Sequence, residues 1–139
     1  MTPGALLQLA KEAMGKAYAP YSGFSVGAAL LCGDGSVYQG CNIENGAFSP
    51  TNCAERTAFF KAVSEGHREF TAIAICGGRD GAITGKITPC GVCRQVMGEF
   101  CQEDFRIYLG KENGGYEERT LGQLLPEGFS LHNQAYFPK

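Results

Sequence analysis

The sequence of 139 residues contains no tryptophan, only two histidines and no long apolar run. Because His67 and His132 are the only histidines, few candidates exist for a histidine base or a histidine-rich metal site. No apolar stretch approaches the roughly 20 residues that a membrane-spanning helix needs. Residues 1–10 also lack the basic segment and apolar run of a signal peptide. We therefore expect no membrane partner.

Runs of like charge are missing as well. The chain has 12 Lys and Arg against 14 Asp and Glu, a formal net charge of −2 and a pI of about 5.7. Proteins that bind nucleic acid usually carry a basic patch or stripe. The charge pattern therefore predicts no nucleic-acid partner.

Cysteine, in contrast, is plentiful. An odd count of seven in a chain without a leader is typical of a reducing cytoplasm, where thiols remain free for metal binding or catalysis. The length and an ordinary hydrophobic content of 44% predict one domain spanning residues 1–139.

Helix and strand signals alternate along the chain. Capping and apolar spacing predict helices at 2–17, from a Thr51 or Asn52 cap to about 65, from Pro89 to about 101, and a helical turn at 121–125. Strands are expected at 24–32, 37–43, 71–76, 106–109 and 117–120, with a glycine-rich loop at 77–88. This order predicts an α/β fold in which helices cover both faces of a mixed sheet.

Two short motifs carry most of the chemistry: Cys53-Ala54-Glu55 and Pro89-Cys90-Gly91-Val92-Cys93. Both cysteine groups stand at predicted helix starts, where free N–H groups favour thiolates. Three thiolates leave one open position on a tetrahedral zinc ion, as catalytic zinc sites do. A ligand-x-Glu followed by Pro-Cys-x-x-Cys is the signature of zinc-dependent deaminases. The motifs therefore predict a catalytic zinc held by Cys53, Cys90 and Cys93.

Two other interpretations of these cysteines remain. A structural zinc site needs a fourth protein ligand, and the spacing of the other cysteines suggests none. A redox Cys-x-x-Cys would leave Cys53 and Glu55 without a role.

The residues after Cys53 have alternatives too. Glu55 fits a capping box with Asn52, or it carries protons for a reaction at the metal. Arg56 fits a surface salt bridge, or it donates to the sulfurs and offsets the net −1 charge of a zinc ion with three thiolates.

Asn42 and Glu44 lie two apart at the end of a predicted strand, so they share a face. An amide and a carboxylate suit the vicinal hydroxyls of a sugar, but a polar strand end that turns through Asn45-Gly46 explains them as well. Phe24 is either a ring that stacks on a base or part of the core.

Four segments, at 19–22, 40–45, 53–58 and 89–95, resemble the small, homotetrameric cytidine deaminases, and the likeness covers nearly the whole chain. The resemblance implies a three-layer α/β/α sandwich with a mixed five-stranded sheet. It also implies one Zn²⁺ per chain on the three cysteines. The expected reaction is the hydrolytic deamination of cytidine and 2′-deoxycytidine to the uridines and ammonia, a step of pyrimidine salvage. Glu55 would move a proton from water to ring N3 and then to the amino group.

The same resemblance implies the substrate contacts. Asn42 and Glu44 are expected on the ribose, Phe24 beside the ligand and the Ala54 backbone on the pyrimidine. Phe129 is expected to stack on the base in a neighbouring subunit's site, so that the tetramer shares its active sites.

Some features depart from the family pattern or leave rivals. Phe48 stands where tyrosine is common, the loop before Thr88 is longer, and the tail after Phe129 has no assigned role. The rivals are a deaminase of another aminopyrimidine nucleoside, of the antibiotic type, and a non-catalytic zinc module. A nucleic-acid-editing enzyme is disfavoured by the charge.

Overall fold

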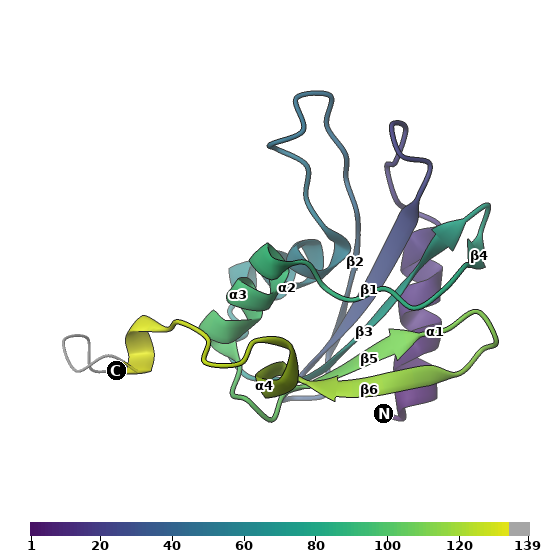
Figure 1. Cartoon of the computed structure of the whole chain (residues 1–139). Coiled ribbons are helices and arrows are strands. Elements are labelled where there is room, and N and C mark those ends of the chain that lie inside the picture. Colours follow the sequence, from purple (N-terminus) through teal and green to yellow (C-terminus); the bar gives the residue numbers. More distant parts are fainter. Residues whose placement is uncertain (134–139) are drawn as a thin grey trace.

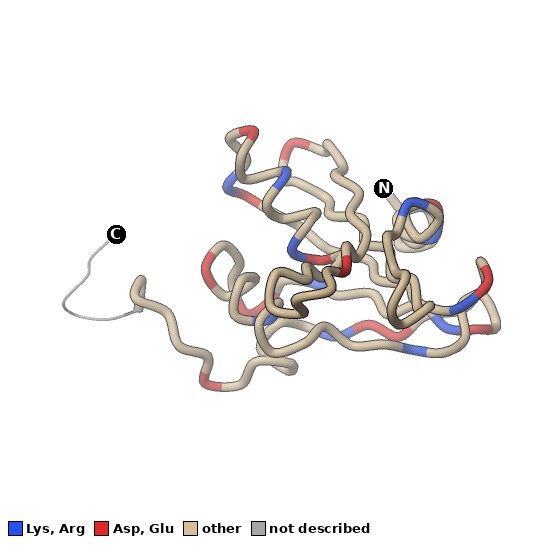
Figure 2. Tube along the Cα trace, turned by 90° about the horizontal axis from the view of Figure 1, so that it is seen from above, with Lys and Arg blue, Asp and Glu red and all other residues tan. Residues whose placement is uncertain are grey.

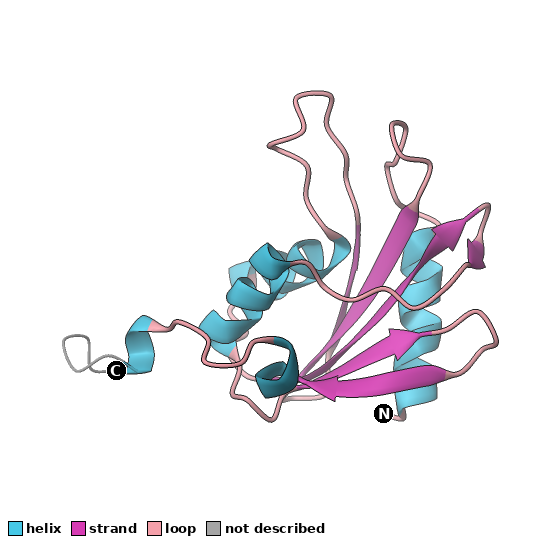
Figure 3. Ribbon diagram, in the orientation of Figure 1, coloured by secondary structure: helices cyan, strands magenta, loops and turns pink. Residues whose placement is uncertain are grey.

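The structure is a computed structural model, and it describes residues 1–133. Helices and strands alternate after an N-terminal helix and a hairpin (Figures 1 and 3). In chain order the elements are α1 (Pro3–Met14), β1 (Ser25–Cys32), β2 (Val37–Cys41), α2 (Ala54–Ser64), β3 (Phe70–Arg79), β4 (Ala82–Ile83), α3 (Gly91–Phe100), β5 (Arg106–Gly110), β6 (Tyr116–Thr120), α4 (Leu121–Leu124) and the 3₁₀ turn η1 (Leu131–Asn133).

The strands form one mixed sheet in the order β2-β1-β3-β5-β6. Only β3 and β5 run parallel, with Ile73 opposite Ile107, and α3 lies on the crossover between them. The other pairs are antiparallel, and the two-residue β4 pairs with the end of β3. The predicted mixed sheet of five strands is confirmed, with β4 as a short addition that the sequence did not suggest.

Helices cover both faces of this sheet, so the predicted three-layer sandwich is also confirmed (Figure 1). On one face α1 packs Leu6 and Ala10 against β1 and β3. On the other face Phe59 of α2 is fully buried among aromatic rings, including Phe70 and Phe105. Burial of these two apolar layers is the main stabilising contribution to the fold.

Two glycines let the helices approach the sheet closely. A Cβ at Gly27 of β1 would overlap the backbone of Ala10 in α1, and one at Gly40 of β2 would overlap the backbone of Ala54 and Ala58 in α2. The neighbouring strands β1 and β2 thus each have a glycine where a helix packs closely against the sheet, α1 on one face and α2 on the other.

The predicted start of α2 was wrong. The helix begins at Ala54 with Cys53 as its N-cap, and no side chain caps it. The side chain of Asn52 instead donates to Thr57 Oγ1 at 3.0 Å, so Asn52 forms no capping box with Glu55. An extended backbone at the cap leaves the Cys53 thiol free for other contacts.

Other ends differ by a few residues. α1 has the predicted Thr2 cap, with Ala5 N donating to Thr2 Oγ1 at 3.1 Å, but it ends at Met14 rather than at residue 17. α3 begins at Gly91 with Cys90 as N-cap, so Pro89 precedes the helix and does not lie in its first turn.

The glycine-rich loop begins later in the chain than predicted. β3 continues through Gly77 and Gly78 to Arg79 and forms a tight hairpin with β4. A Cβ at Gly77 would meet the Phe24 ring, and one at Gly78 would overlap the Ala82 backbone. Glycine is needed here for close packing inside a strand, not for a flexible loop.

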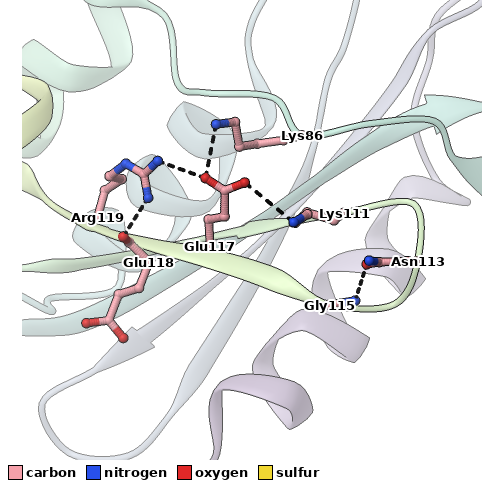
Figure 4. A network of polar contacts seen from close by, with 7 residues as sticks. All are labelled: Lys86, Lys111, Asn113, Gly115, Glu117, Glu118 and Arg119. Carbon is pink, nitrogen blue, oxygen red and sulfur yellow. Dashed lines mark hydrogen bonds and ion pairs between the residues drawn. The ribbon is translucent and has the colours of Figure 1, made fainter.

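A charged network ties the segment before Cys90 to β6 (Figure 4). Lys86 Nζ lies 3.1 Å from Glu117 Oε1, and Arg119 Nη2 lies 2.8 Å from the same oxygen. Lys111 Nζ is 3.6 Å from the other oxygen of Glu117. The network thus connects Lys86, four residues before Cys90, with the edge strand β6.

Elsewhere Lys and Arg are interspersed with Asp and Glu along most of the described trace (Figure 2), and the acidic residues Glu99, Glu103 and Asp104 follow one another without a basic residue between them. Among residues 1–133 no helix is both long enough and apolar enough to cross a bilayer.

Candidate active site

The starts of α2 and α3 bring three sulfurs together. Cys53 and Cys90 are the two N-cap residues, and Cys93 lies in the first turn of α3. Their Sγ atoms all lie within 4.8 Å of one another, and Cys53 Sγ is 3.8 Å from Cys90 Sγ. Two thiolates on a tetrahedral zinc ion with bonds of about 2.3 Å are about 3.8 Å apart. The three sulfurs therefore fit one zinc ion.

No fourth ligand-type atom joins this group in the described part of the chain. All seven cysteines are free thiols, and the remaining ones lie elsewhere. A tetrahedral ion on Cys53, Cys90 and Cys93 thus keeps one position for water or substrate, in contrast to the closed coordination of structural zinc sites.

The surroundings favour a thiolate at Cys53. Its pKa is lowered to about 5, first because the Cys93 side chain hydrogen-bonds to it and further because Arg56 lies beside it. The pKa of Cys93 is raised, since its proton is held by Cys53 and its side chain is buried. The backbone N–H groups at the start of α2, which no side chain caps, also stabilise negative charge there.

Glu55 lies in the first turn of α2 and is only 5% exposed. Burial raises the pKa of its carboxyl group to about 7, although a hydrogen bond with Cys93 opposes this shift. A carboxyl group with a pKa near neutrality can both accept and release a proton. It therefore has the position and the chemistry of a proton carrier beside the sulfurs.

Arg56 makes the contact with the sulfurs that the sequence suggested. Its Nη2 donates to Cys53 Sγ at 3.3 Å. Its Nε is buried and has no hydrogen-bond partner within residues 1–133. Burial acts to lower the pKa of this guanidinium, but hydrogen bonds to Cys53 and Cys93 outweigh it and raise the pKa.

Replacement of Arg56 by glutamine is expected to weaken zinc binding by about 10- to 100-fold, the usual cost of losing a partner of a metal ligand. The change removes the positive charge that offsets three thiolates but keeps a polar, though shorter, side chain. Zinc affinity measured in a chelator competition would test this. Replacement of Arg68, whose Nη1 donates only to backbone carbonyls at the far end of α2, is the matched control. Equal affinities for the Arg56 variant and the control would contradict the role.

Asn42 follows β2 and is buried against β1. Its Oδ1 accepts from Val26 N at 2.8 Å, and its Nδ2 donates to Phe24 O at 2.9 Å. The amide therefore fixes the start of β1, and its second N–H remains for a ligand. The structural interpretation of this residue and a sugar contact are thus compatible.

Glu44 holds the turn before β1. One carboxylate oxygen accepts from the backbone N–H groups of Tyr21 and Ser22 at 3.0 and 3.1 Å, and the other accepts from Ser22 Oγ. The Ser22 hydroxyl is the main reason that the pKa of Glu44 is lowered. The Glu44 carboxylate is therefore a charged acceptor with a fixed orientation.

An open hollow of about 430 Å³ lies over Glu44, lined also by Tyr21, Ser22, Asn45, Phe48 and Thr51. Phe48 is 74% exposed and has a left-handed backbone with a φ of 63°. An exposed phenylalanine in a strained conformation at a mostly apolar hollow indicates a contact surface.

Phe24 is half-buried beside Gly77, and the Arg79 guanidinium lies 5.6 Å from the centroid of its ring. Arg79 Nη1 also donates to Ser22 O at 2.7 Å. Phe24, Asn42 and Glu44 are thus joined through one small network.

The other two expected contacts lie apart from this network. Ala54 is fully buried at the first position of α2, between Cys53 and Glu55. Phe129 is 61% exposed, and its carbonyl accepts from Gln95 Nε2 of α3 at 2.8 Å. No described contact joins Phe129 to the cysteines. The tail beyond it is described only as far as Asn133.

Sequence reasoning missed three residues that build the site: Tyr21, Ser22 and Arg79. The first two belong to the Ala19-Pro20-Tyr21-Ser22 segment, which is part of the resemblance but suggests no role for either residue. Nothing in the sequence signals that Arg79 reaches back over Phe24.

Known proteins can now be compared with this geometry. Residues 2–109 match the family model of the cytidine and deoxycytidylate deaminase zinc-binding region. A cytidine deaminase of Sporosarcina psychrophila is 52% identical over 94% of this chain and 93% of its own length. One of Halalkalibacterium halodurans is 50% identical over 92% and 94%, respectively.

Among solved structures, a cytidine deaminase from Burkholderia pseudomallei superimposes with a TM-score of 0.86 at 48% identity. It covers 93% of this chain and 100% of its own. The wild-type enzyme from Mycobacterium tuberculosis gives a TM-score of 0.78 at 37% identity, over 94% and 98%. With the family model matching well over half of its residues, the chain belongs to the cytidine and deoxycytidylate deaminase family, with its zinc-binding region.

Proposed function

We propose that the protein hydrolyses cytidine and 2′-deoxycytidine to uridine and 2′-deoxyuridine with release of ammonia. The observation that carries this proposal is a group of three sulfurs with an open position and a buried Glu55 beside it. Cys53, Cys90 and Cys93 are the proposed ligands of one Zn²⁺ per chain. When bound, zinc on three thiolates activates a water molecule for attack on the substrate.

The chain's own residues then move protons. Glu55 accepts a proton from the attacking water and delivers it to ring N3, which makes C4 more electrophilic. A C–O bond forms at C4, and Glu55 then takes the proton of the new C4 hydroxyl group and passes it to the 4-amino group, while the C4=O bond forms. The C4–N bond breaks, and ammonia leaves. Burial raises the pKa of the Glu55 carboxyl group to about 7, so the group can take up and release a proton near neutral pH.

Binding of the nucleoside is assigned to the network around Phe24. The remaining N–H of Asn42 and the fixed carboxylate of Glu44 suit the hydroxyls of the sugar. The Phe24 ring lies beside them, and the backbone of Ala54 is assigned to the pyrimidine.

We further infer a homotetramer whose subunits share their active sites. Large apolar side chains remain exposed on α2, on α3, on the loop after β2 and on the C-terminal segment: Phe60, Val92, Ile43, Phe48, Phe129 and Leu131. A neighbouring subunit would cover them and receive Phe129. The protein is further proposed to form a single domain over residues 1–139 and to act in pyrimidine salvage in the cytoplasm, where its free thiols persist.

Turnover of a substrate panel tests the activity. We expect purified protein to convert cytidine and 2′-deoxycytidine, followed by ultraviolet absorbance and ammonia release, with about one zinc per chain. Cytosine, deoxycytidylate, aminopyrimidine nucleoside antibiotics and single-stranded DNA complete the panel. Stoichiometric zinc without turnover of either nucleoside would overturn the proposal. Turnover of an antibiotic alone would favour the rival deaminase, and no turnover at all would favour a non-catalytic zinc module.

Sharing of sites predicts complementation between two defective variants. Phe129→Ala should lose about 10- to 100-fold in kcat/KM, because stacking on a base contributes about 1–3 kcal/mol. When the Phe129→Ala and Glu55→Gln proteins are refolded together, the mixture should regain activity. Sites that combine Glu55 of one chain with Phe129 of another make up about one quarter of the total in an equal random mixture.

Each variant refolded alone provides the control. Activity of the mixture equal to the mean of the two separate preparations would show that Phe129 does not act in a neighbouring site.

A further inference from the structure

A second group of metal-ligand side chains lies at the opposite end of α2. The ligand atoms of Cys32, Asp34 and His67 all lie within 4.8 Å of one another. Cys32 is the last residue of β1, Asp34 lies in the turn that follows it, and His67 follows the end of α2. Because Cys53 caps the other end of this eleven-residue helix, the two groups are separated by about 16 Å of helix.

The distance between Asp34 and His67 is typical of two ligands rather than of a hydrogen bond. Asp34 Oδ2 and His67 Nδ1 are 3.8 Å apart, whereas Glu99 Oε2 and His132 Nε2 close to 2.8 Å in the same molecule. Two O or N ligands of a tetrahedral zinc ion, with bonds of about 2.0–2.1 Å, are about 3.4 Å apart. A movement of a few tenths of an ångström would thus complete the ligand set.

The surrounding turn holds the ligands in place. Asp34 Oδ1 accepts from Ser36 N at 3.0 Å and from Ser36 Oγ at 2.6 Å, so Oδ2 remains for another partner. The Tyr38 ring packs edge-on against His67 with centroids 5.1 Å apart and fixes the imidazole. A register shift between Leu31 and Cys32 alters the strand at the point where Cys32 is placed.

Burial and charge set the chemistry of the group. Cys32 is 1% exposed, and burial raises the pKa of its thiol, so an incoming ion must displace a proton. The side chain of Glu69 lies beside Gly33 and adds negative charge, while Arg68 is engaged with the backbone carbonyls of Val63 and His67. A thiolate, a carboxylate and a neutral imidazole together would balance a divalent ion with borderline softness.

We propose that Cys32, Asp34 and His67 form a second metal site, which binds Zn²⁺ and joins the β1–β2 turn to the end of α2. The fourth position is left for water. The site lies outside the proposed catalytic machinery, and it stabilises the folded chain because the unfolded chain does not bring these ligands together. The proposal does not depend on which nucleoside the enzyme converts.

Calorimetric titration with Zn²⁺ of the full-length protein that already holds one zinc per chain tests the site. We expect one further equivalent to bind and to raise the melting temperature. Asp34→Asn, which keeps the acceptor for Ser36, and His67→Asn should each weaken this second binding by at least about tenfold, an effect as large as losing a metal ligand's partner. Cys32→Ser should weaken it as well, but the two surface variants carry the test if this buried change impairs folding. Cytidine turnover should stay unchanged in Asp34→Asn and His67→Asn.

His132→Asn is the matched control, because it removes the other histidine without touching the group. The assignment would be supported if His132→Asn still binds the second equivalent of Zn²⁺ while the Asp34 and His67 variants do not. Absence of a second equivalent in the wild-type protein would overturn it. Equally strong second binding in all the variants would overturn it too, because the ion would then lie elsewhere.

Discussion

Replacement of Glu55 by glutamine is expected to lower kcat for cytidine by about 10²- to 10⁴-fold, the usual contribution of a positioned acid or base. The loss should reach the upper end, because one carboxyl group serves two successive proton transfers. Glutamine keeps the size of the side chain and needs no proton, so zinc content and melting temperature should hold or rise. Steady-state turnover, a zinc assay and a melting curve on one preparation would measure this.

The matched control is Glu65→Gln, since Glu65 is the C-cap of the same helix and is exposed. It should leave kcat unchanged. Near-normal turnover in the Glu55 variant with full zinc occupancy would rule out the proton-carrier role and would require another base.

Replacement of Cys90 by serine is expected to abolish stable zinc binding and activity together. Cys90 is exposed, so its loss leaves no cavity in the core. Serine offers a hydroxyl that stays protonated at neutral pH and binds zinc far more weakly than a thiolate. The loss of affinity should exceed the roughly 10- to 100-fold cost of removing a mere partner of a ligand. Zinc retained after dialysis against a chelator, with turnover measured on the same sample, would give the result.

Cys41→Ser provides the comparison, because Cys41 lies on β2 and its thiol donates to the Lys16 carbonyl, at 3.4 Å, away from the three sulfurs. This variant should retain zinc and activity. A Cys90 variant that kept its zinc and lost only activity would mean that Cys53 and Cys93 hold the ion with another ligand.

The sequence predicted much of this site because its ligands stand in short local motifs. Cys53 and Glu55 are two residues apart, and Cys90 and Cys93 are three apart, so one turn at each helix start places the members of a pair together whatever the rest of the fold does. The order of elements likewise predicted the layers, since strands alternating with helices permit few arrangements.

Errors arose where a tertiary contact overrides a local preference. Asn52 is a good cap by residue type, but Thr57 takes its side chain. Gly77 and Gly78 suggest a loop, but they continue β3 because neighbouring groups leave no room for a side chain.

The sequence could not predict contacts between residues that are far apart along the chain. The contacts of Glu44 with Ser22 span 22 residues, and those of Arg79 with Ser22 span 57. The group of Cys32, Asp34 and His67 has no spacing signal either, because its members meet only when the end of β1 and the turn after it lie beside the segment that follows α2.

The close approach at Gly40 links the sheet to the catalytic chemistry. The backbone carbonyl of Ala54 would overlap any side chain on this strand position, so the first turn of α2 rests directly on β2. Cys53 and Glu55 flank Ala54, so their distance from the sheet depends on the absence of a side chain at Gly40. We expect a substitution at Gly40 to displace the proposed metal ligand Cys53 and the proposed proton carrier Glu55 together, and so to lower activity from a position on the strand beneath them.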